Sequence, residues 1–149
     1  MLDRFRSPTP TPTHSPSRPP AFAQPPRDRW VLVIDDDSAI LSLTHDALVA
    51  ERLDVVTASS GPVALDLLWS VDHDQPDLII LDLDLPELNG LAIASLYARI
   101  PVPHAPILVC SGNPDAAQHA EHINAAGVLP KPFDVEELIS TTSDLISVP

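Results

Sequence analysis

An uninterrupted apolar run, Trp30 to Ile34, ends in three consecutive carboxylates, Asp35, Asp36 and Asp37. Apolar runs of this length, bounded by charge, are typical of strands buried on both faces, as in a parallel sheet. A strand that ends in acids gathers like charges at one edge of the sheet, where they raise one another's pKa unless a cation neutralises them. Carboxylate oxygens suit Mg²⁺, an ion that often shares its coordination shell with phosphate. The feature therefore indicates a metal-assisted phosphoryl site.

Further apolar runs along the chain also end close to residues that carry chemistry. These residues are Asp82 after the run 78–81, Ser111 after the run 106–110 and Lys131 shortly after the run 127–129. In open parallel sheets, ligands bind in the crevice beyond the carboxyl ends of the strands. We therefore expect the acids, the hydroxyl and the lysine, which is the only lysine in the chain, to form one constellation.

The alternation of strand and helix patterns predicts an α/β layered sheet. Strands are predicted at 30–34, 54–58, 78–82, 106–111 and 127–129, and helices at 38–51, 62–70, 90–98, 114–126 and 134–147. Pro62 suits the first turn of its helix. All four glycines fall at predicted boundaries, which supports this division. A chain of 149 residues is long enough for one domain with a sizeable core.

The first 29 residues differ in composition from the rest. They contain eight prolines and almost no aliphatic periodicity. This predicts a disordered, partly polyproline arm, residues 1–29, before a folded domain, residues 30–149. The arm carries five arginines against two aspartates, whereas the domain carries three basic residues against nineteen acids. So acidic a domain argues against direct nucleic-acid binding, which needs a basic surface.

The remaining composition bears on location. The sequence shows no apolar core of a secretory signal and no stretch long enough to span a membrane. The single cysteine, Cys110, permits no internal disulfide, so we expect a cytoplasmic protein. Strand alternation turns Cys110 away from the side of Ser111, and we interpret it as a small buried hydrophobe. The histidines show no metal-ligand spacing with cysteine, and His119 and His122 are predicted to lie on a solvated helix face.

The segment from about Trp30 to Val148 resembles the receiver domain of two-component response regulators. The residues that carry the resemblance are, in order, Asp35 and Asp36, then Asp82, Leu85-Pro86, Gly90, Ser111 and Lys131-Pro132. The resemblance implies a flavodoxin-like fold, a five-stranded, doubly wound parallel sheet with strand order 2-1-3-4-5. It also implies a cis peptide between Lys131 and Pro132.

The same resemblance implies a role for each site residue. Asp82 is the phosphate acceptor, Ser111 and Lys131 contact the phosphoryl oxygens, and Mg²⁺ is held by Asp35, Asp36, Asp82 and the backbone carbonyl of Asp84. An aspartate that attacks phosphorus forms an acyl phosphate, and positioned cations and donors must meet the charge on its equatorial oxygens. Such a chain is a switch that undergoes only self-phosphorylation and autodephosphorylation, not a turnover enzyme.

Partners also follow from the resemblance. A sensor histidine kinase or a histidine phosphotransfer protein would supply the phosphoryl group. Because few residues follow the last predicted helix, we expect a stand-alone receiver that signals to a downstream target protein. The contact would involve the face built by the segments 114–126, 127–129 and 134–147. The sequence leaves homodimer formation open, and also whether the chain is an end point or a shuttle in a relay.

Three positions depart from the usual family pattern. Asp84 adds a carboxylate near the acceptor, and we expect it to change the lifetime of the phosphorylated state, in a direction that the sequence leaves open. Asn113, two residues after Ser111, is a neutral amide in the same outer ring. Val128 stands where the family often has a switching Tyr or Phe, so no aromatic rotamer switch is expected. Asp37, beyond the acid pair, is predicted to cap the following helix.

Two alternative functions remain open. A degenerate receiver would serve as a constitutive interaction module, which Val128 and Asp84 favour but the joint presence of all five site residues opposes. A haloacid-dehalogenase-type phosphatase would use Asp82-Leu83-Asp84 as its nucleophile motif. In that class the metal-binding acids lie downstream, whereas here the acid cluster lies upstream and no acid pair ends a strand after Lys131. Turnover of a phosphomonoester would distinguish the phosphatase.

Overall fold

The structure is a computed structural model that describes residues 29–70 and 74–147. In this part of the chain, strands and helices alternate five times. Their bounds are β1 Trp30–Ile34, α1 Ser38–Val49, β2 Asp54–Ala58, α2 Gly61–Trp69, β3 Leu78–Leu81, α3 Gly90–Arg99, β4 Ile107–Ser111, α4 Ala116–His122, β5 Gly127–Pro130 and α5 Val135–Ser147. The strands form one sheet in the order β2-β1-β3-β4-β5, and every neighbouring pair is parallel. This confirms the predicted doubly wound, flavodoxin-like fold.

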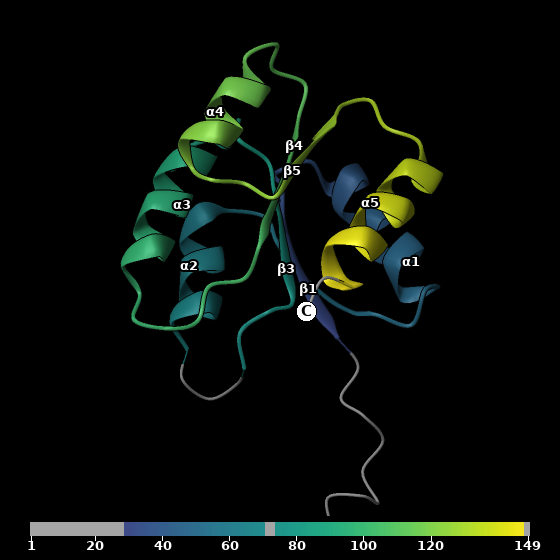
Figure 1. Ribbon diagram of the computed structural model, residues 1–149, viewed down its shortest axis with the longest axis horizontal. Helices are drawn as coiled ribbons and strands as arrows, with labels where there is room; N and C mark the ends of the chain where they lie inside the picture. The colour runs from purple at the N-terminus through teal and green to yellow at the C-terminus, as the bar shows by residue number, and fades with distance from the viewer. Residues whose placement is uncertain (1–28, 71–73, 148–149) are drawn as a thin grey trace, which may run out of the picture.

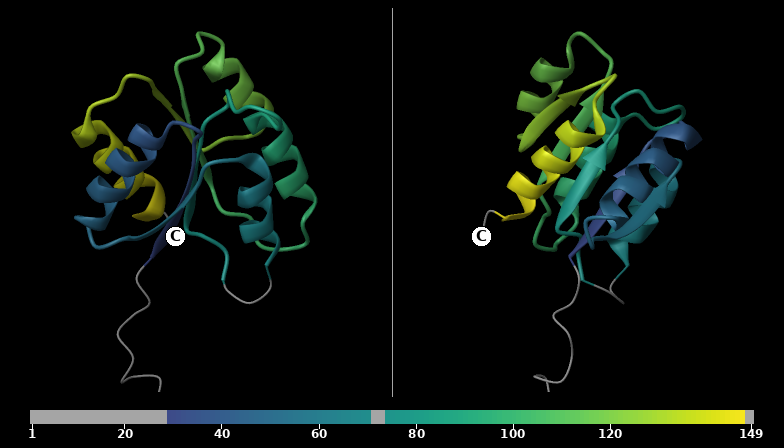
Figure 2. Two further views of the ribbon diagram at one scale, coloured as in Figure 1. Left: turned by 180° about the vertical axis from the view of Figure 1, so that it is seen from behind. Right: turned by 90° about the vertical axis from the view of Figure 1, so that its right-hand side faces the viewer.

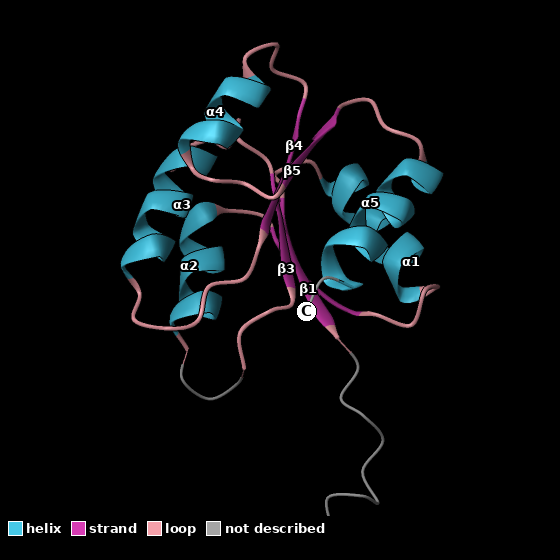
Figure 3. Cartoon of the chain, viewed as in Figure 1, coloured by secondary structure: helices cyan, strands magenta, loops and turns pink. Residues whose placement is uncertain are grey.

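Helices cover both faces of the sheet (Figure 1). Helices α2, α3 and α4 lie on one side, and α1 and α5 lie on the other. The view from behind shows the same three layers (Figure 2, left). With the elements coloured by type, the strands form the central layer and the helices the two outer ones (Figure 3). Because both faces are covered, the central strands β1 and β3 are apolar along nearly their whole length.

Side-chain alternation along β1 divides its residues between two cores. Leu32 and Ile34 pack in the cluster that includes Leu68 of α2 and Ile93 of α3. The intervening Val31 and Val33 pack on the opposite face, in the cluster with Leu48 of α1 and Leu138 of α5. Each fully buried side chain of this size contributes about 1.5–3 kcal/mol by removal from water. The two cores hold the carboxyl end of β1, and the acids that follow it, in a fixed place.

Polar side chains begin the helices that follow the first strands. Oδ1 of Asp37 accepts hydrogen bonds from the backbone amides of Ala39 and Ile40, at 2.9 and 3.3 Å, which confirms the predicted cap of α1. Ser60 and Asn89 cap α2 and α3 in the same way. These caps satisfy amides that the first helical turn leaves without partners.

Most predicted bounds agree with the structure within about two residues, but helix α4 is shorter than predicted. The prediction covered 114–126, whereas the helix spans Ala116–His122. Before it, Oδ1 of Asn113 accepts a hydrogen bond from the backbone amide of Asp115 at 2.8 Å, and this contact forms a turn. After it, Asn124 adopts a left-handed backbone with φ 54°, which asparagine tolerates and which ends a helix.

Two further predictions concern the N-terminal arm and membrane-spanning helices. The predicted arm, residues 1–29, lies outside the described residues except for Arg29. Within 29–70 and 74–147, no helix has both the length and the apolar character that crossing a membrane requires.

Candidate functional site

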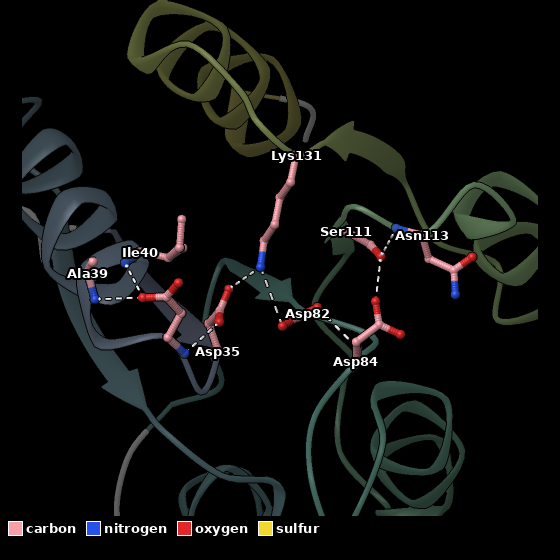
Figure 4. Close-up of polar contacts among 9 residues, drawn as sticks. Asp35, Ala39, Ile40, Asp82, Asp84, Ser111, Asn113 and Lys131 are labelled. Atoms are coloured by element: carbon pink, nitrogen blue, oxygen red, sulfur yellow. Dashed lines mark hydrogen bonds and ion pairs between the residues drawn. The ribbon is translucent and has the colours of Figure 1, made fainter.

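The predicted site residues meet at the carboxyl edge of the sheet (Figure 4). The parallel register pairs Ile34 with Leu81, and Leu81 with Val109, so the loops after β1, β3 and β4 leave the sheet side by side. Figure 4 shows the side chains that these loops and the end of β5 present to one another, those of Asp35, Asp82, Ser111 and Lys131. The topology therefore assembles residues that are far apart in the sequence.

Three carboxylates form an acidic pocket. Each of Asp35, Asp36 and Asp82 offers an oxygen that lies within 4.8 Å of the others. Asp35 and Asp82 are only 2% and 4% exposed, whereas Asp36 is exposed. Several hard oxygen donors beside open solvent match the preference of Mg²⁺, which keeps part of its water shell. The donor set therefore fits this ion, and such a triad is typical of the Mg²⁺ site of receiver domains.

Lys131 provides the positive charge of the site. Its Nζ atom lies 2.7 Å from Oδ2 of Asp35 and 3.4 Å from Oδ2 of Asp82. Burial by itself would lower the pKa of Lys131, but the hydrogen bond to Asp35 and the charges of Asp35 and Asp82 hold that pKa above its usual range. The ammonium is therefore charged at neutral pH. The peptide from Lys131 to Pro132 is cis, as the resemblance implied.

Asp82 lies between this ammonium and the backbone of its own loop. Its Oδ1 accepts a hydrogen bond from the backbone amide of Asp84 at 3.1 Å, and its Oδ2 faces Lys131. Burial raises the pKa of Asp82, and the charge of Asp35 adds to this. The amide of Asp84 and the ammonium of Lys131 oppose that rise only in part. The ionised carboxylate is therefore oriented but under-stabilised, a state that a bound cation relieves.

Ser111 is held by two hydrogen bonds on the other side of Asp82. Its Oγ accepts from the backbone amide of Asn113 at 3.0 Å and donates to Oδ2 of Asp84 at 3.2 Å. Ser111 is 1% exposed, whereas Asp84 is exposed to solvent. The sequence placed Asp84 near Asp82 but carried no signal that its side chain would bind Ser111. That its backbone carbonyl is a metal ligand stays a prediction.

Gly90 positions the loop that follows β3 through a close backbone contact, which the sequence alone did not reveal. A Cβ atom at this position would lie 2.5 Å from the carbonyl oxygen of Asp82 and 2.8 Å from Cα of Leu83. The amide of Gly90 also donates to the carbonyl of Leu83 at 3.0 Å. The start of α3 therefore packs directly against the backbone of the loop that follows β3. The motif match identified this glycine, but only the tertiary structure shows the contact.

The structure also tests the predictions for neighbouring residues. Cys110 is buried in the core with β1 and β3, and burial raises the pKa of its thiol to about 12, which confirms its role as a small hydrophobe. Val128 packs beside Val109 and helix α4, so an aliphatic side chain occupies that place. His122 is exposed as predicted, whereas His119 is half-buried.

Comparisons with known proteins agree with this geometry. The family described as the response regulator receiver domain matches residues 31–143. A curated relative, the response regulator MprA of Mycolicibacterium vanbaalenii, is 33% identical over 118 residues, which are 78% of this chain and 49% of that protein. The DNA-binding transcriptional regulator NtrC of Escherichia coli K12 is 33% identical over 118 residues, covering 78% of this chain and 24% of NtrC. The chain thus spans half or less of the length of these relatives.

Solved structures show the same fold. A putative response regulator from Chloroflexus aurantiacus superposes with a TM-score of 0.73 at 25% identity, over 81% of this chain and 99% of that one. The family match, the parallel sheet and the pocket of Asp35, Asp36 and Asp82 lead to one conclusion. This chain belongs to the response regulator receiver domain family, and its acidic pocket is consistent with accepting a phosphoryl group.

Proposed function

We propose that the protein is a phosphorylation-operated switch in which Asp82 accepts a phosphoryl group in a Mg²⁺-dependent reaction. Receiver domains interact with histidine kinases, and we propose a sensor histidine kinase or a histidine phosphotransfer protein as the donor. The observation that carries this proposal is the placement of Asp82. Its carboxylate is buried, lies 3.4 Å from the ammonium of Lys131 and shares a pocket with Asp35 and Asp36.

The chemistry is a transfer between a nitrogen and an oxygen. A carboxylate oxygen of Asp82 attacks the phosphorus of the phosphohistidine, and a P–O bond forms as the P–N bond breaks. The electron pair of the broken bond stays on the imidazole nitrogen, which takes up a proton. The product is an acyl phosphate. The switch returns to its unphosphorylated state by hydrolysis: water attacks the phosphorus, the bond to Asp82 breaks, and inorganic phosphate leaves.

The surrounding residues would meet the charge on the transferred group. Its charge is spread over three equatorial oxygens. Lys131 is already oriented toward Asp82 and would pair with one oxygen, and the hydroxyl of Ser111 would donate to another. Asp35, Asp36, Asp82 and the backbone carbonyl of Asp84 would hold Mg²⁺, which when bound neutralises charge on the phosphoryl oxygens.

We also propose that the chain divides into an arm, residues 1–29, and a receiver domain, residues 30–149. The proposed location of the protein is the cytoplasm. Its output would be a phosphorylation-dependent contact with a target protein. For the reading surface we propose the face of α4, β5 and α5, where Glu121, Glu136 and Glu137 are exposed. A partner for that face would carry complementary positive charge.

Intact mass after incubation with acetyl phosphate and Mg²⁺ tests the proposed acceptor. We expect a gain of about 80 Da, one phosphoryl group, that is absent in Asp82→Asn and after metal chelation. The matched control is Asp66→Asn, which removes an exposed acid from α2 and should leave the gain intact. A gain that persists in Asp82→Asn would place the acceptor elsewhere.

Membership of the receiver family rules against one alternative function, the haloacid-dehalogenase-type phosphatase. The remaining alternative is a constitutive interaction module. Absence of the adduct with acetyl phosphate, and again with a purified histidine phosphotransfer protein as donor, would favour that module.

A further inference from the structure

The hydroxyl of Ser111 donates a hydrogen bond to the side chain of Asp84 (Figure 4). We propose that Asp84 is a positioning residue that competes with the phosphoryl group for the single hydrogen of this hydroxyl and thereby opposes the phosphorylated state. This inference rests on the proposed function, because it concerns the same site. It gives a direction to the effect of Asp84 that the sequence left open.

The geometry allows only one arrangement of the hydroxyl hydrogen. The backbone amide of Asn113 is a donor, so Oγ of Ser111 uses a lone pair for that contact, at 3.0 Å. A carboxylate accepts, so the hydrogen of Ser111 lies in the 3.2 Å contact with Oδ2 of Asp84. A serine hydroxyl has no second hydrogen to offer. A phosphoryl oxygen on Asp82 can therefore be bound only if the contact with Asp84 is broken.

Because Ser111 is buried, water does not take part in the competition for its hydroxyl hydrogen. Ser111 is 1% exposed, so bulk water cannot satisfy its hydroxyl while the side chain changes partners. Asp84 is exposed, and water replaces Ser111 at its carboxylate once the hydrogen bond breaks. The hydroxyl therefore has two acceptors to choose from, and release from Asp84 is reversible.

Charge acts in the same direction. The backbone amide of Asp84 donates to Oδ1 of Asp82, which keeps the two residues adjacent in one tight loop. The ammonium of Lys131 pairs with Asp35 and Asp82 instead of Asp84. A phosphoryl group on Asp82 would thus stand beside a second negative charge that Lys131 does not share. The hydrogen bond and the repulsion both favour the unphosphorylated site.

Binding of beryllofluoride, a stable phosphoryl mimic, measures the competition. At saturating Mg²⁺, which removes any difference in metal affinity, we expect Asp84→Ala to bind beryllofluoride about three- to tenfold more tightly than the wild type by calorimetry. The matched control is Glu87→Gln, which removes one exposed negative charge from the same loop and should leave the affinity unchanged. An equal gain in both variants would reduce the effect to net charge and overturn the proposal.

Coupling to Ser111 is the second measurement. In a Ser111→Ala background, Asp84→Ala should produce a smaller gain in beryllofluoride affinity than in the wild type, because only the charge repulsion is left to relieve. In the metal-free protein, urea unfolding of the two single variants and the double variant should be non-additive, because both substitutions remove the same hydrogen bond. Additive effects in either measurement would overturn the role of Asp84. A wild type that binds no beryllofluoride and forms no adduct would instead overturn the proposed function, and this inference with it.

Discussion

Nζ of Lys131 donates a hydrogen bond of 2.7 Å to Oδ2 of Asp35, which lies 96 positions earlier in the chain. Asp82, the proposed acceptor, is a more distant partner of the same ammonium, at 3.4 Å. Asp35 is nearly fully buried, so this contact compensates a charge that would otherwise be costly. The lysine therefore stabilises the folded protein as well as serving the proposed transfer.

Removal of this lysine should destabilise the protein. Lys131→Met leaves the buried charge of Asp35 without its partner, and we expect a loss of about 2 kcal/mol in the free energy of unfolding at pH 7, measured with urea. Asp35→Asn in the same background should recover part of that loss, because the uncompensated charge is gone. Strictly additive losses would contradict the pairing.

Replacement of Asp82 by asparagine should stabilise the protein at neutral pH. The pKa of Asp82 in the fold lies above its ordinary value of 3.8, chiefly because of burial. The folded state therefore binds the proton more tightly than the unfolded state, and this contribution is present below the unfolded pKa and lost as pH rises through the folded pKa. We expect Asp82→Asn to be about 1 kcal/mol more stable than the wild type at pH 7 without Mg²⁺.

The pH dependence is the check on this explanation. The advantage of Asp82→Asn should shrink as the pH falls toward 3.8, where the wild-type carboxyl is also neutral. Thermal unfolding of both proteins across this range measures the difference. A constant advantage at every pH would point to a cause other than ionisation.

Mg²⁺ should stabilise the wild type by mass action. An ion at a concentration about 100 times its dissociation constant adds about 2.7 kcal/mol to the free energy of unfolding. Asp36→Asn should lose much of this gain while its metal-free stability stays close to that of the wild type, because Asp36 is exposed. Thermal unfolding with and without Mg²⁺ measures both quantities. Full Mg²⁺ stabilisation of Asp36→Asn would exclude this carboxylate as a ligand.

Two glycines of the site should respond differently to alanine. In Gly90→Ala the new Cβ meets the carbonyl of Asp82 at 2.5 Å, so the loop that follows β3 must move. We expect a loss of about 1–3 kcal/mol and slower adduct formation with acetyl phosphate. In Gly112→Ala the Cβ lies 3.8 Å from Cβ of Lys131, an ordinary contact, and stability should be retained. Equal losses in the two variants would contradict the steric explanation.

Cys110 should be unreactive in the folded protein. Its thiol is buried, with a pKa of about 12, so very little thiolate exists at pH 8. We expect iodoacetamide to label it only after denaturation, as followed by intact mass. Rapid labelling of the native protein would show that the core around β4 opens readily.

The sequence predicted the fold, and the residues that meet at the carboxyl edge of the sheet, through local signals. Apolar runs buried on both faces predict parallel strands, and a polar residue just after each run must emerge at the carboxyl edge. Helix α4 was the weakest prediction, because its ends depend on the turn at Asn113 and the left-handed backbone of Asn124. Neither signal is visible in hydrophobic periodicity.

Partner choice within the site was decided by the tertiary structure alone. Lys131 lies nearest to Asp35, and Ser111 binds Asp84. The sequence predicts only which strand each of these residues follows, not which of them are in contact. The contact between Gly90 and the backbone of Asp82 was likewise visible only in three dimensions. The physical reason is that strand periodicity depends on neighbours along the chain. Hydrogen-bond partners instead depend on distances of a few ångströms between loops that are joined only through the packed core.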